Sequence, residues 1–216
     1  MHPLTPRFLI AGAVAAGLAG CAGMAGPDYD ALMASMLKSS FRDQGIAKLD
    51  RLQQDASNAE CSASEGKPLP DDRAQAIQKT ALATVKMPAG GQFIGDWQRG
   101  ERLAQNGRGM TWTDPSAAPS ANGGNCYNCH QISKQEISYG TIGPSLYNYG
   151  KNRGVTDPNG SLSRPIVEYT WTKIYNAKSY NACSGMPRFG HLGMLDEQQM
   201  KDLMALLLDP KSPVNQ

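Results

Sequence analysis

The sequence predicts an all-α fold, and three stretches of it favour this class. Apolar residues recur at helical spacing within residues 28–58, where the register drifts near Gly45, and again from residue 71 to about residue 85. Near the C-terminus, Asp196 can cap a helix whose third residue is Gln199, in the pattern of a capping box. We therefore expect a helical N-terminal extension, followed by a domain that ends in a well-delimited helix.

Residues 1–20 have the layout of a secretory signal peptide of the lipoprotein type. Arg7 precedes an apolar run that is too short and too rich in glycine and alanine to be a convincing membrane-spanning helix. The signal ends in Leu18-Ala19-Gly20-Cys21, which resembles the lipobox of bacterial lipoproteins, so Cys21 would become the acylated first residue of the mature chain. The alternative is ordinary signal cleavage beside an incidental cysteine.

Acyl chains on Cys21 would anchor the protein to a membrane surface. Ala22 follows this cysteine, at the position where an aspartate is the usual signal for retention in the inner membrane. We therefore predict a periplasmic protein, with its lipid anchor in the inner leaflet of the outer membrane. The formal net charge is +2 and the sequence has no basic patch, so no nucleic-acid partner is predicted.

Residues 21–90 are predicted to form a linker and the helical extension, and residues 91–216 the main domain. A stretch rich in proline and glycine at 87–91 marks the boundary between the two. A short helix over 96–106 would open the main domain. The following loop, over 106–125, is rich in glycine, proline, serine and alanine and leads into the most informative motif of the chain.

That motif is Cys126-Tyr127-Asn128-Cys129-His130, which matches the attachment sequence of a c-type haem. Two thiols three residues apart can each form a thioether with a haem vinyl group, and the adjacent imidazole can bind the iron. A zinc half-site or a redox Cys-x-x-Cys pair would need a second ligand pair or a thioredoxin-like unit, and the sequence contains neither. Because the motif occurs once, one covalent haem c is predicted, held by Cys126 and Cys129 with His130 as iron ligand.

The haem motif and the C-terminal helix together predict the class I cytochrome c fold. In that fold two helices cross over one edge of the haem, and a loop ahead of the last helix supplies the sixth iron ligand. Met186 lies in this loop, and Pro187 would stiffen the backbone that presents its sulfur. His191 is the main alternative, because bis-histidine ligation would lower the reduction potential, and Met194 and Cys183 are further candidates.

A methionine ligand would favour Fe(II) and fill the open coordination position, which suits electron transfer rather than peroxidase or oxygen chemistry. Pro144 falls where cytochromes c present a carbonyl to the Nδ1–H of the proximal histidine, which would fix the tautomer of His130. Other side chains could line the pocket or meet the haem propionates, although simple core packing is as good an account of the aromatic ones. They are Tyr147, Tyr149, Tyr169, Trp171, Tyr175, Arg153 and Arg188.

Two cysteines, Cys61 and Cys183, remain once the haem and the lipid have been assigned. In an oxidising compartment they are expected to form a disulfide, which would tie the extension to the loop just ahead of Met186. Two buried reduced thiols are the alternative, as is a role for one of them as haem ligand or nucleophile.

Several segments of the chain resemble the SoxX family, the monohaem cytochrome subunits of the SoxAX complex of bacterial thiosulfate oxidation. They are residues 95–97, 107–110, 123–127, 139–146, 173–177, 183–190 and 208–210, together with Cys61. The lipobox departs from this family, many of whose members look like soluble periplasmic proteins.

The resemblance implies an enzyme complex, an L-cysteine S-thiosulfotransferase, whose catalytic cysteine lies on the partner cytochrome SoxA. This chain would then carry no catalytic residue. It would accept the electrons released when thiosulfate is joined to a cysteine of the carrier SoxYZ, and pass them to a soluble cytochrome c. Two alternatives stay open: a free-standing, membrane-tethered monohaem electron carrier without a sulfur role, and a haem sensor whose Met186–iron bond opens for a small ligand.

Overall fold

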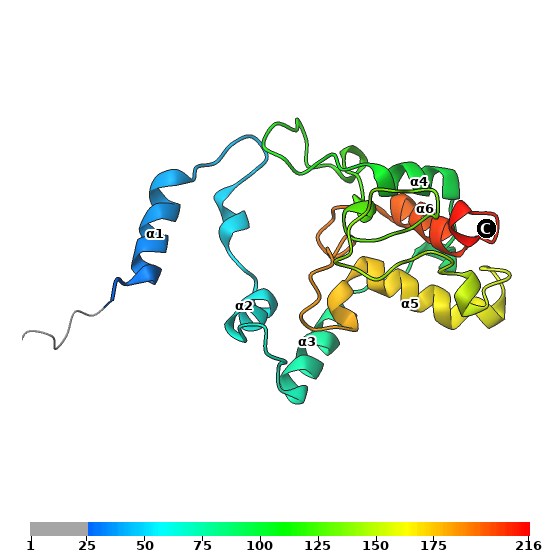
Figure 1. Cartoon of the computed structure of the whole chain (residues 1–216), viewed down its shortest axis with the longest axis horizontal. Coiled ribbons are helices and arrows are strands. Elements are labelled where there is room, and N and C mark those ends of the chain that lie inside the picture. The colour runs from blue at the N-terminus through cyan, green and yellow to red at the C-terminus, as the bar shows by residue number, and fades with distance from the viewer. Residues whose placement is uncertain (1–25) are drawn as a thin grey trace, which may run out of the picture. The chain divides into compact units, whose positions relative to one another are not determined.

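The computed structural model describes residues 26–216, so the predicted signal peptide and Cys21 lie outside the described residues (Figure 1). Within this range every regular element is a helix, and the only β-type pairing is an isolated bridge between Gln44 and Ala47. The predicted all-α class is therefore confirmed. The described residues divide into two compact units, 26–42 and 43–216, which are described separately.

The described part of the first unit contains the helix α1 (Tyr29–Ser40), which Asp28 caps by accepting a hydrogen bond from the Ala31 N–H at 3.0 Å. The large apolar side chains of α1 are exposed except for the half-buried Leu37, and no residue of the helix is buried. The expectation of helix through residues 28–58 is right for its first third and wrong after Ser40. There the chain turns extended at Phe41, so that the periodic apolar residues beyond it belong to other elements.

The second unit begins with the rest of the extension, which contains a 3₁₀ turn (Leu49–Leu52), α2 (Ala56–Ala63) and α3 (Asp71–Ala83). Gly45 explains the break that precedes them. It has a φ of +50°, and a Cβ at this position would sit 2.5 Å from the Trp112 carbonyl oxygen, so the backbone here is a tight turn closed by the Gln44–Ala47 bridge. The helix expected from residue 71 to about residue 85 is observed as α3.

Helix α3 packs onto the main domain through buried Ile77 and Ala81, against the 3₁₀ turn at Ala177–Ser179. Two polar contacts fix it there. The Trp171 indole N–H donates to the Lys86 carbonyl at 2.8 Å, and the Asn176 amide donates to Thr84 Oγ1 at 3.0 Å. From residue 43 onwards the extension is thus built into the same compact unit as the main domain.

The core of the main domain is the crossing of α4 (Trp97–Gln105) and α6 (Glu197–Leu208), which lie side by side in Figure 1. The helices approach closely because Gly100 has no side chain, and a Cβ there would overlap the Asp202 carbonyl. The capping box of Asp196 and Gln199 is present as predicted. The residues of α6 that the crossing and its neighbours bury are Met200, Asp202, Leu203, Met204, Ala205, Leu206, Leu207 and Leu208.

Asp202 is a buried carboxylate that joins the two crossing helices. It accepts hydrogen bonds from Arg99 Nε at 2.7 Å, Arg99 Nη2 at 2.9 Å, the Asp96 N–H at 2.8 Å and the Gln198 amide at 2.9 Å. A buried charge is tolerated when such partners surround it, and the two-point arginine contact also fixes the rotation of one helix against the other.

Helix α5 (Arg164–Tyr175) was not predicted from the sequence. It begins with Pro165 in its first turn and is rich in β-branched and aromatic residues, which have only modest helix propensity. Tertiary burial stabilises it instead, because Val167, Trp171 and Ile174 enter the core beside α6. The remaining short turns are 3₁₀ helices at Ala89–Gly91, Pro119–Ala121, Cys126–Asn128, Lys151–Arg153, Ser161–Ser163, Ala177–Ser179 and Pro213–Asn215.

Candidate functional site

The Cys-x-x-Cys-His motif forms one tight turn on the wall of a large cavity. Asn125 enters the turn in the left-handed conformation, with φ +50°, and the Cys126 carbonyl accepts hydrogen bonds from the Cys129 and His130 N–H groups at 3.1 and 3.0 Å. The cavity measures about 900 Å³, and both thiols and the imidazole line it. The sequence spacing therefore places two thioether-forming groups and one nitrogen donor around a single space.

The segment 140–146 folds back over the motif and fixes the orientation of His130. Three backbone hydrogen bonds join the two stretches, from Gly140 N to Tyr127 O, Gly143 N to Cys129 O and Leu146 N to Gln131 O, at 2.8, 2.8 and 2.7 Å. They bring the Pro144 carbonyl to 2.7 Å from His130 Nδ1. A carbonyl can only accept, so Nδ1 carries the proton and Nε2 keeps a lone pair for a metal. The structure thus places Pro144 where the sequence analysis expected it.

Gly143 is a further determinant of this arrangement, and the sequence analysis did not single it out. A Cβ on Gly143 would overlap the imidazole ring of His130, and a Cβ on Gly140 would overlap the Asn128 carbonyl. Both glycines therefore allow a close approach of backbone to the motif. In the sequence Gly143 is marked only by its place next to Pro144, and a glycine next to a proline more commonly marks an ordinary turn.

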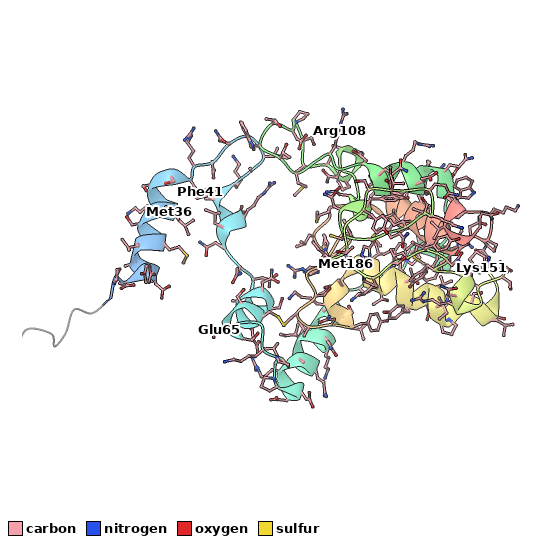
Figure 2. The ribbon with its side chains drawn as sticks, in the orientation of Figure 1. Met36, Phe41, Glu65, Arg108, Lys151 and Met186 are labelled. Atoms are coloured by element: carbon pink, nitrogen blue, oxygen red, sulfur yellow. A yellow bond between two sulfur atoms is a disulfide. The ribbon has the colours of Figure 1, made fainter. Side chains whose placement is uncertain are left out.

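Met186 lines the same cavity from the loop between α5 and α6 (Figure 2). Its side chain is partly buried against the core, and its N–H donates to Ser184 Oγ at 3.3 Å. Pro187 and the buried Phe189 are its neighbours in the cavity wall. The structure thus brings together His130 and Met186, the two predicted iron ligands, around one space.

The other candidates for the sixth ligand are divided by the fold. Cys183 lines the cavity, but Met194 packs against the hydrophobic core outside it. His191 lines a different, smaller cavity of about 290 Å³ beside α2 and α3. There burial and the Arg188 guanidinium lower the pKa of His191, while Asp55 opposes the shift. Of the four, Met186 and Cys183 alone line the space that the haem motif faces.

The rest of the cavity wall is mostly apolar and includes two cationic side chains, Arg153 and Lys173. Tyr149 is buried, and its hydroxyl shares a 2.9 Å hydrogen bond with Thr170 Oγ1, while burial raises its pKa. The Arg153 guanidinium lies 3.7 Å from the centre of the Tyr149 ring, and burial lowers the pKa of the Lys173 ammonium, which also lines the cavity. These two cations could meet carboxylate groups of a bound cofactor. Lys173 lies in a SoxX-like segment but had no predicted role in the pocket.

Several of the aromatic and basic side chains proposed from the sequence lie elsewhere. Tyr169 does line the cavity, with its ring 4.6 Å from that of Tyr180. By contrast, Trp171 is a core residue, the Tyr147 hydroxyl donates to the carbonyl of the last residue at 3.0 Å, and Tyr175 packs over Gly190. Arg188 is occupied by an ion pair with Asp55 and does not reach the cavity. The expectation that Arg188 pairs with a haem propionate is therefore wrong. The structure gives no support for a pocket role of Trp171, Tyr147 or Tyr175.

Cys61 and Cys183 are bonded to each other, with their Cα atoms 5.5 Å apart. The predicted disulfide is thus confirmed, and the alternative of two reduced thiols is excluded in this structure. It connects α2 to the loop that carries Met186, across 122 residues of sequence. The cysteines that stay unbonded among the described residues are Cys126 and Cys129, and burial, followed by the neighbouring Cys129, raises the pKa of the Cys126 thiol to about 12.

The residues of this cavity fit a covalently bound haem. The two thiols, one imidazole with its Nδ1 already satisfied, one thioether sulfur and an apolar wall are the donor set that such a group requires. The volume is also within the usual range for a cofactor site. Elsewhere in residues 26–216 no cluster of three or more His, Cys, Asp or Glu side chains could hold a metal ion. In the same range no helix is long and apolar enough to cross a membrane.

Two comparisons with known proteins bear on this site. A family model described as Cytochrome c matches residues 97–210, which include the haem motif, the 140–146 segment and the Met186 loop. A protein named "Uncharacterized lipoprotein" from Aquifex aeolicus (strain VF5) is 38% identical to the chain over 176 residues, covering 80% of this chain and 75% of the relative. The second match extends beyond the main domain, since its 176 residues exceed the length of residues 91–216.

Proposed function

The chain belongs to the cytochrome c family, and we propose that it is the electron-transfer subunit of a SoxAX-like L-cysteine S-thiosulfotransferase. As a cytochrome c it is an electron-transfer haem protein, and the predicted class I fold with an N-terminal extension is confirmed. The haem c, when bound, supplies an iron centre that gains and loses one electron at a time.

In this proposal the residues that would hold the haem have distinct roles. Cys126 and Cys129 would hold the haem through thioethers, while His130 through Nε2 and Met186 through its sulfur would bind the iron. The Pro144 carbonyl keeps the proton on His130 Nδ1, which leaves Nε2 as the ring nitrogen with a lone pair for the iron. A methionine ligand favours the reduced state, so the site would accept electrons readily.

The reaction that the complex would catalyse joins a carrier thiol to thiosulfate. A cysteine thiol of the SoxYZ carrier and the thiosulfate dianion would form a new S–S bond, giving a cysteine S-thiosulfonate, one proton and two electrons. The S–H bond of the carrier cysteine is the bond that breaks. The catalytic cysteine would lie on a SoxA-like partner cytochrome, and this chain would take the electrons singly and pass them to a soluble cytochrome c.

The observation that carries the proposal is where the SoxX-like segments lie. Residues 139–146 include the Gly143-Pro144 clamp over His130, and residues 183–190 form the loop that presents Met186. Cys61, another matching position, is bonded to Cys183, the first residue of that loop. Four of the seven SoxX-like segments, 123–127, 139–146, 173–177 and 183–190, contribute residues to the cavity wall, whereas 95–97, 107–110 and 208–210 do not.

We further propose that Cys21 is acylated and holds the protein at a membrane surface on the periplasmic side. The relative from Aquifex aeolicus carries the word lipoprotein in its name, which supports this part of the proposal. Labelling cells with a palmitate analogue should mark the wild-type protein and not a Cys21→Ala variant. Absence of label on the wild type would contradict the anchor.

The experiment that tests the function is affinity purification of the tagged protein from thiosulfate-grown cells, followed by haem staining of the bands that co-purify. A second c-type cytochrome, with haem reduction that depends on both thiosulfate and the carrier protein, would support the thiosulfotransferase subunit. A single haem band that exchanges electrons but ignores thiosulfate would contradict it and leave a membrane-tethered electron carrier.

A further inference from the structure

The Cys61–Cys183 disulfide is asymmetric in its surroundings. Cys183 is exposed at the surface, whereas Cys61 on α2 is half-buried. Both line a second cavity of about 720 Å³, bounded by α2, the α2–α3 linker and residues 181–185. Cys183 also lines the cavity of the haem motif. A thiol arriving from solvent therefore has an open route to the bond, and Cys183 is the more accessible of the two cysteines.

A buried cation, Lys178, lines the same cavity as the two cysteines. Lys178 is only 3% exposed, and its Nζ lies 3.9 Å from Cys61 Sγ. The ammonium donates to the Ala182 carbonyl at 2.9 Å, and so its hydrogen-bond partner is neutral. Burial, followed by Arg188, lowers the pKa of Lys178, while attraction to Asp55 partly offsets this. A thiolate at Cys61 would supply the counter-charge that this ammonium lacks at close range.

We propose that the Cys61–Cys183 disulfide is a thiol-exchange site at which Lys178 stabilises the departing Cys61 thiolate, and that opening the bond frees the Met186 loop. The thiolate of an external dithiol attacks Cys183 Sγ, a new S–S bond forms to Cys183, and Cys61 leaves with the electron pair of the broken bond. The second thiol of the dithiol then displaces Cys183. Both protein cysteines end reduced, and the dithiol ends as a disulfide.

The chemistry of exchange explains why the position of Lys178 matters. Exchange is faster when the leaving thiol has a lower pKa, and a lysine ammonium beside a thiol lowers that pKa. Attack at Cys183 makes Cys61 the leaving group, which is the sulfur beside the ammonium. Accessibility and charge thus favour the same direction of cleavage.

The link to Met186 is one of chain connectivity, and this part of the inference rests on the proposed iron ligation. Cys183 stands three positions ahead of Met186, so the disulfide pins the start of the loop to α2. The Arg188–Asp55 ion pair is a second tie to the extension on the other side of Met186. Once the disulfide is open, the loop depends on that ion pair and on its own packing.

The direction of cleavage can be tested on the wild-type holoprotein without any variant. Glutathione is added as a monothiol probe, the mixture is trapped with N-ethylmaleimide, and the peptides are mapped by mass spectrometry. In the holoprotein Cys126 and Cys129 are in thioethers and, in the proposed lipoprotein, Cys21 is acylated, so the signal comes from Cys61 and Cys183. We expect glutathione on Cys183 and maleimide on Cys61. The reverse pattern, or equal labelling of both, would overturn the proposed leaving group.

The role of Lys178 is tested by rate. Lys178→Gln keeps a donor for the Ala182 carbonyl but removes the charge, and Lys67→Gln is the matched control because Lys67 is an exposed lysine at the same cavity. With dithiothreitol as the dithiol, we expect Lys178→Gln to open at least about threefold more slowly than wild type. Lys67→Gln should open at the wild-type rate and Lys178→Arg close to it. Equal rates for Lys178→Gln and wild type would overturn the proposal.

The effect on the loop is read from the near-infrared methionine-to-iron band of the oxidised haem. Protein opened with dithiothreitol and trapped with maleimide is desalted, reoxidised with ferricyanide and compared with protein treated with maleimide alone. We expect the band to weaken only in the opened sample, and an unchanged band would overturn the coupling. If the untreated protein has no such band, the Met186 ligation of the proposed function is contradicted. The labelling pattern and the rates of opening by dithiothreitol still test the exchange site in that case.

Discussion

The two sides of the candidate haem cavity are held in place by different means. His130 is positioned by backbone hydrogen bonds between segments that lie within twenty residues of each other, 127–131 and 140–146. Met186 is positioned by ties to residues more than a hundred positions away, the Cys61–Cys183 disulfide and the Arg188–Asp55 ion pair. The comparison teaches that one side of the site is a local motif, whereas the other depends on the N-terminal extension.

The largest effect on haem loading is expected from a single methyl group on the local side. Gly143→Ala should displace the imidazole of His130, because the added Cβ would overlap the ring. We expect the yield of haem-loaded protein, measured as haem absorbance per polypeptide, to fall at least tenfold. A tenfold change in an equilibrium corresponds to about 1.4 kcal/mol. Gly185→Ala in the Met186 loop is the matched control, since a Cβ there meets nothing within 4 Å. Equal loading of the two variants would contradict the proposed constraint.

The next effect concerns the ligand on the distant side. Met186→Ala should abolish the near-infrared methionine-to-iron band and lower the reduction potential, because a methionine ligand raises that potential. Met194→Ala, which removes a methionine from the core outside the cavity, should keep the band. Absorption spectra of the oxidised proteins and a redox titration provide the measurement. A band that persists in Met186→Ala would show that another residue supplies the ligand.

Removing the disulfide should weaken the distant side without disturbing the local one. The double variant Cys61→Ser, Cys183→Ser is expected to lose about 2–5 kcal/mol of unfolding free energy, the usual range for a native disulfide in an exported domain. Urea unfolding followed by haem absorbance measures this loss. The thioethers and the His130–Pro144 hydrogen bond should survive, so haem loading should stay close to wild type. A large fall in loading would show that the local side also needs the extension.

The smallest effect is a dependence on acid at the second tie. Burial alone would raise the pKa of Asp55, but hydrogen bonds from Asn58, Ser57 and Arg188 outweigh it and hold that pKa well below its usual range. A carboxyl group whose pKa is lowered by folding contributes stability above its ordinary pKa of about 4. This contribution is lost as pH falls below that value. Asp55→Asn should therefore lose less stability than wild type between about pH 5 and 2, a difference below about 1 kcal/mol in urea titrations. If the stability of Asp55→Asn and of wild type depended on pH in the same way, the Arg188–Asp55 ion pair would not be a source of stability.

The local side of the site could be predicted from the sequence, since its determinants are near neighbours. The haem motif, the Pro144 carbonyl and the capping box each need only a few consecutive residues, and each was found where expected. The distant side could be anticipated only in part. Cysteine arithmetic gave the disulfide, but that His191 faces the extension and not the haem motif follows from how the loop folds.

What the sequence could not provide are features created by packing. Helix α5 has modest intrinsic propensity and is stabilised by burying Trp171 and Ile174, so its residues gave no helical signal of their own. Lys178 looks like any surface lysine until the fold buries it beside Cys61. The expectation of one helical stretch to residue 58 was wrong because the drift of the apolar register near Gly45, which marks a turn in the structure, was included within the helix.

The disulfide also gives the polypeptide a closed covalent circuit, from Cys61 along the chain to Cys183 and back through the sulfur atoms. The haem motif lies inside this circuit, and so does the exposed, largely coil stretch 106–125. A single protease cut in that stretch would therefore release no fragment. The nicked protein should run as one haem-staining band on a gel without reductant and separate into two pieces with it, only the C-terminal piece retaining the haem.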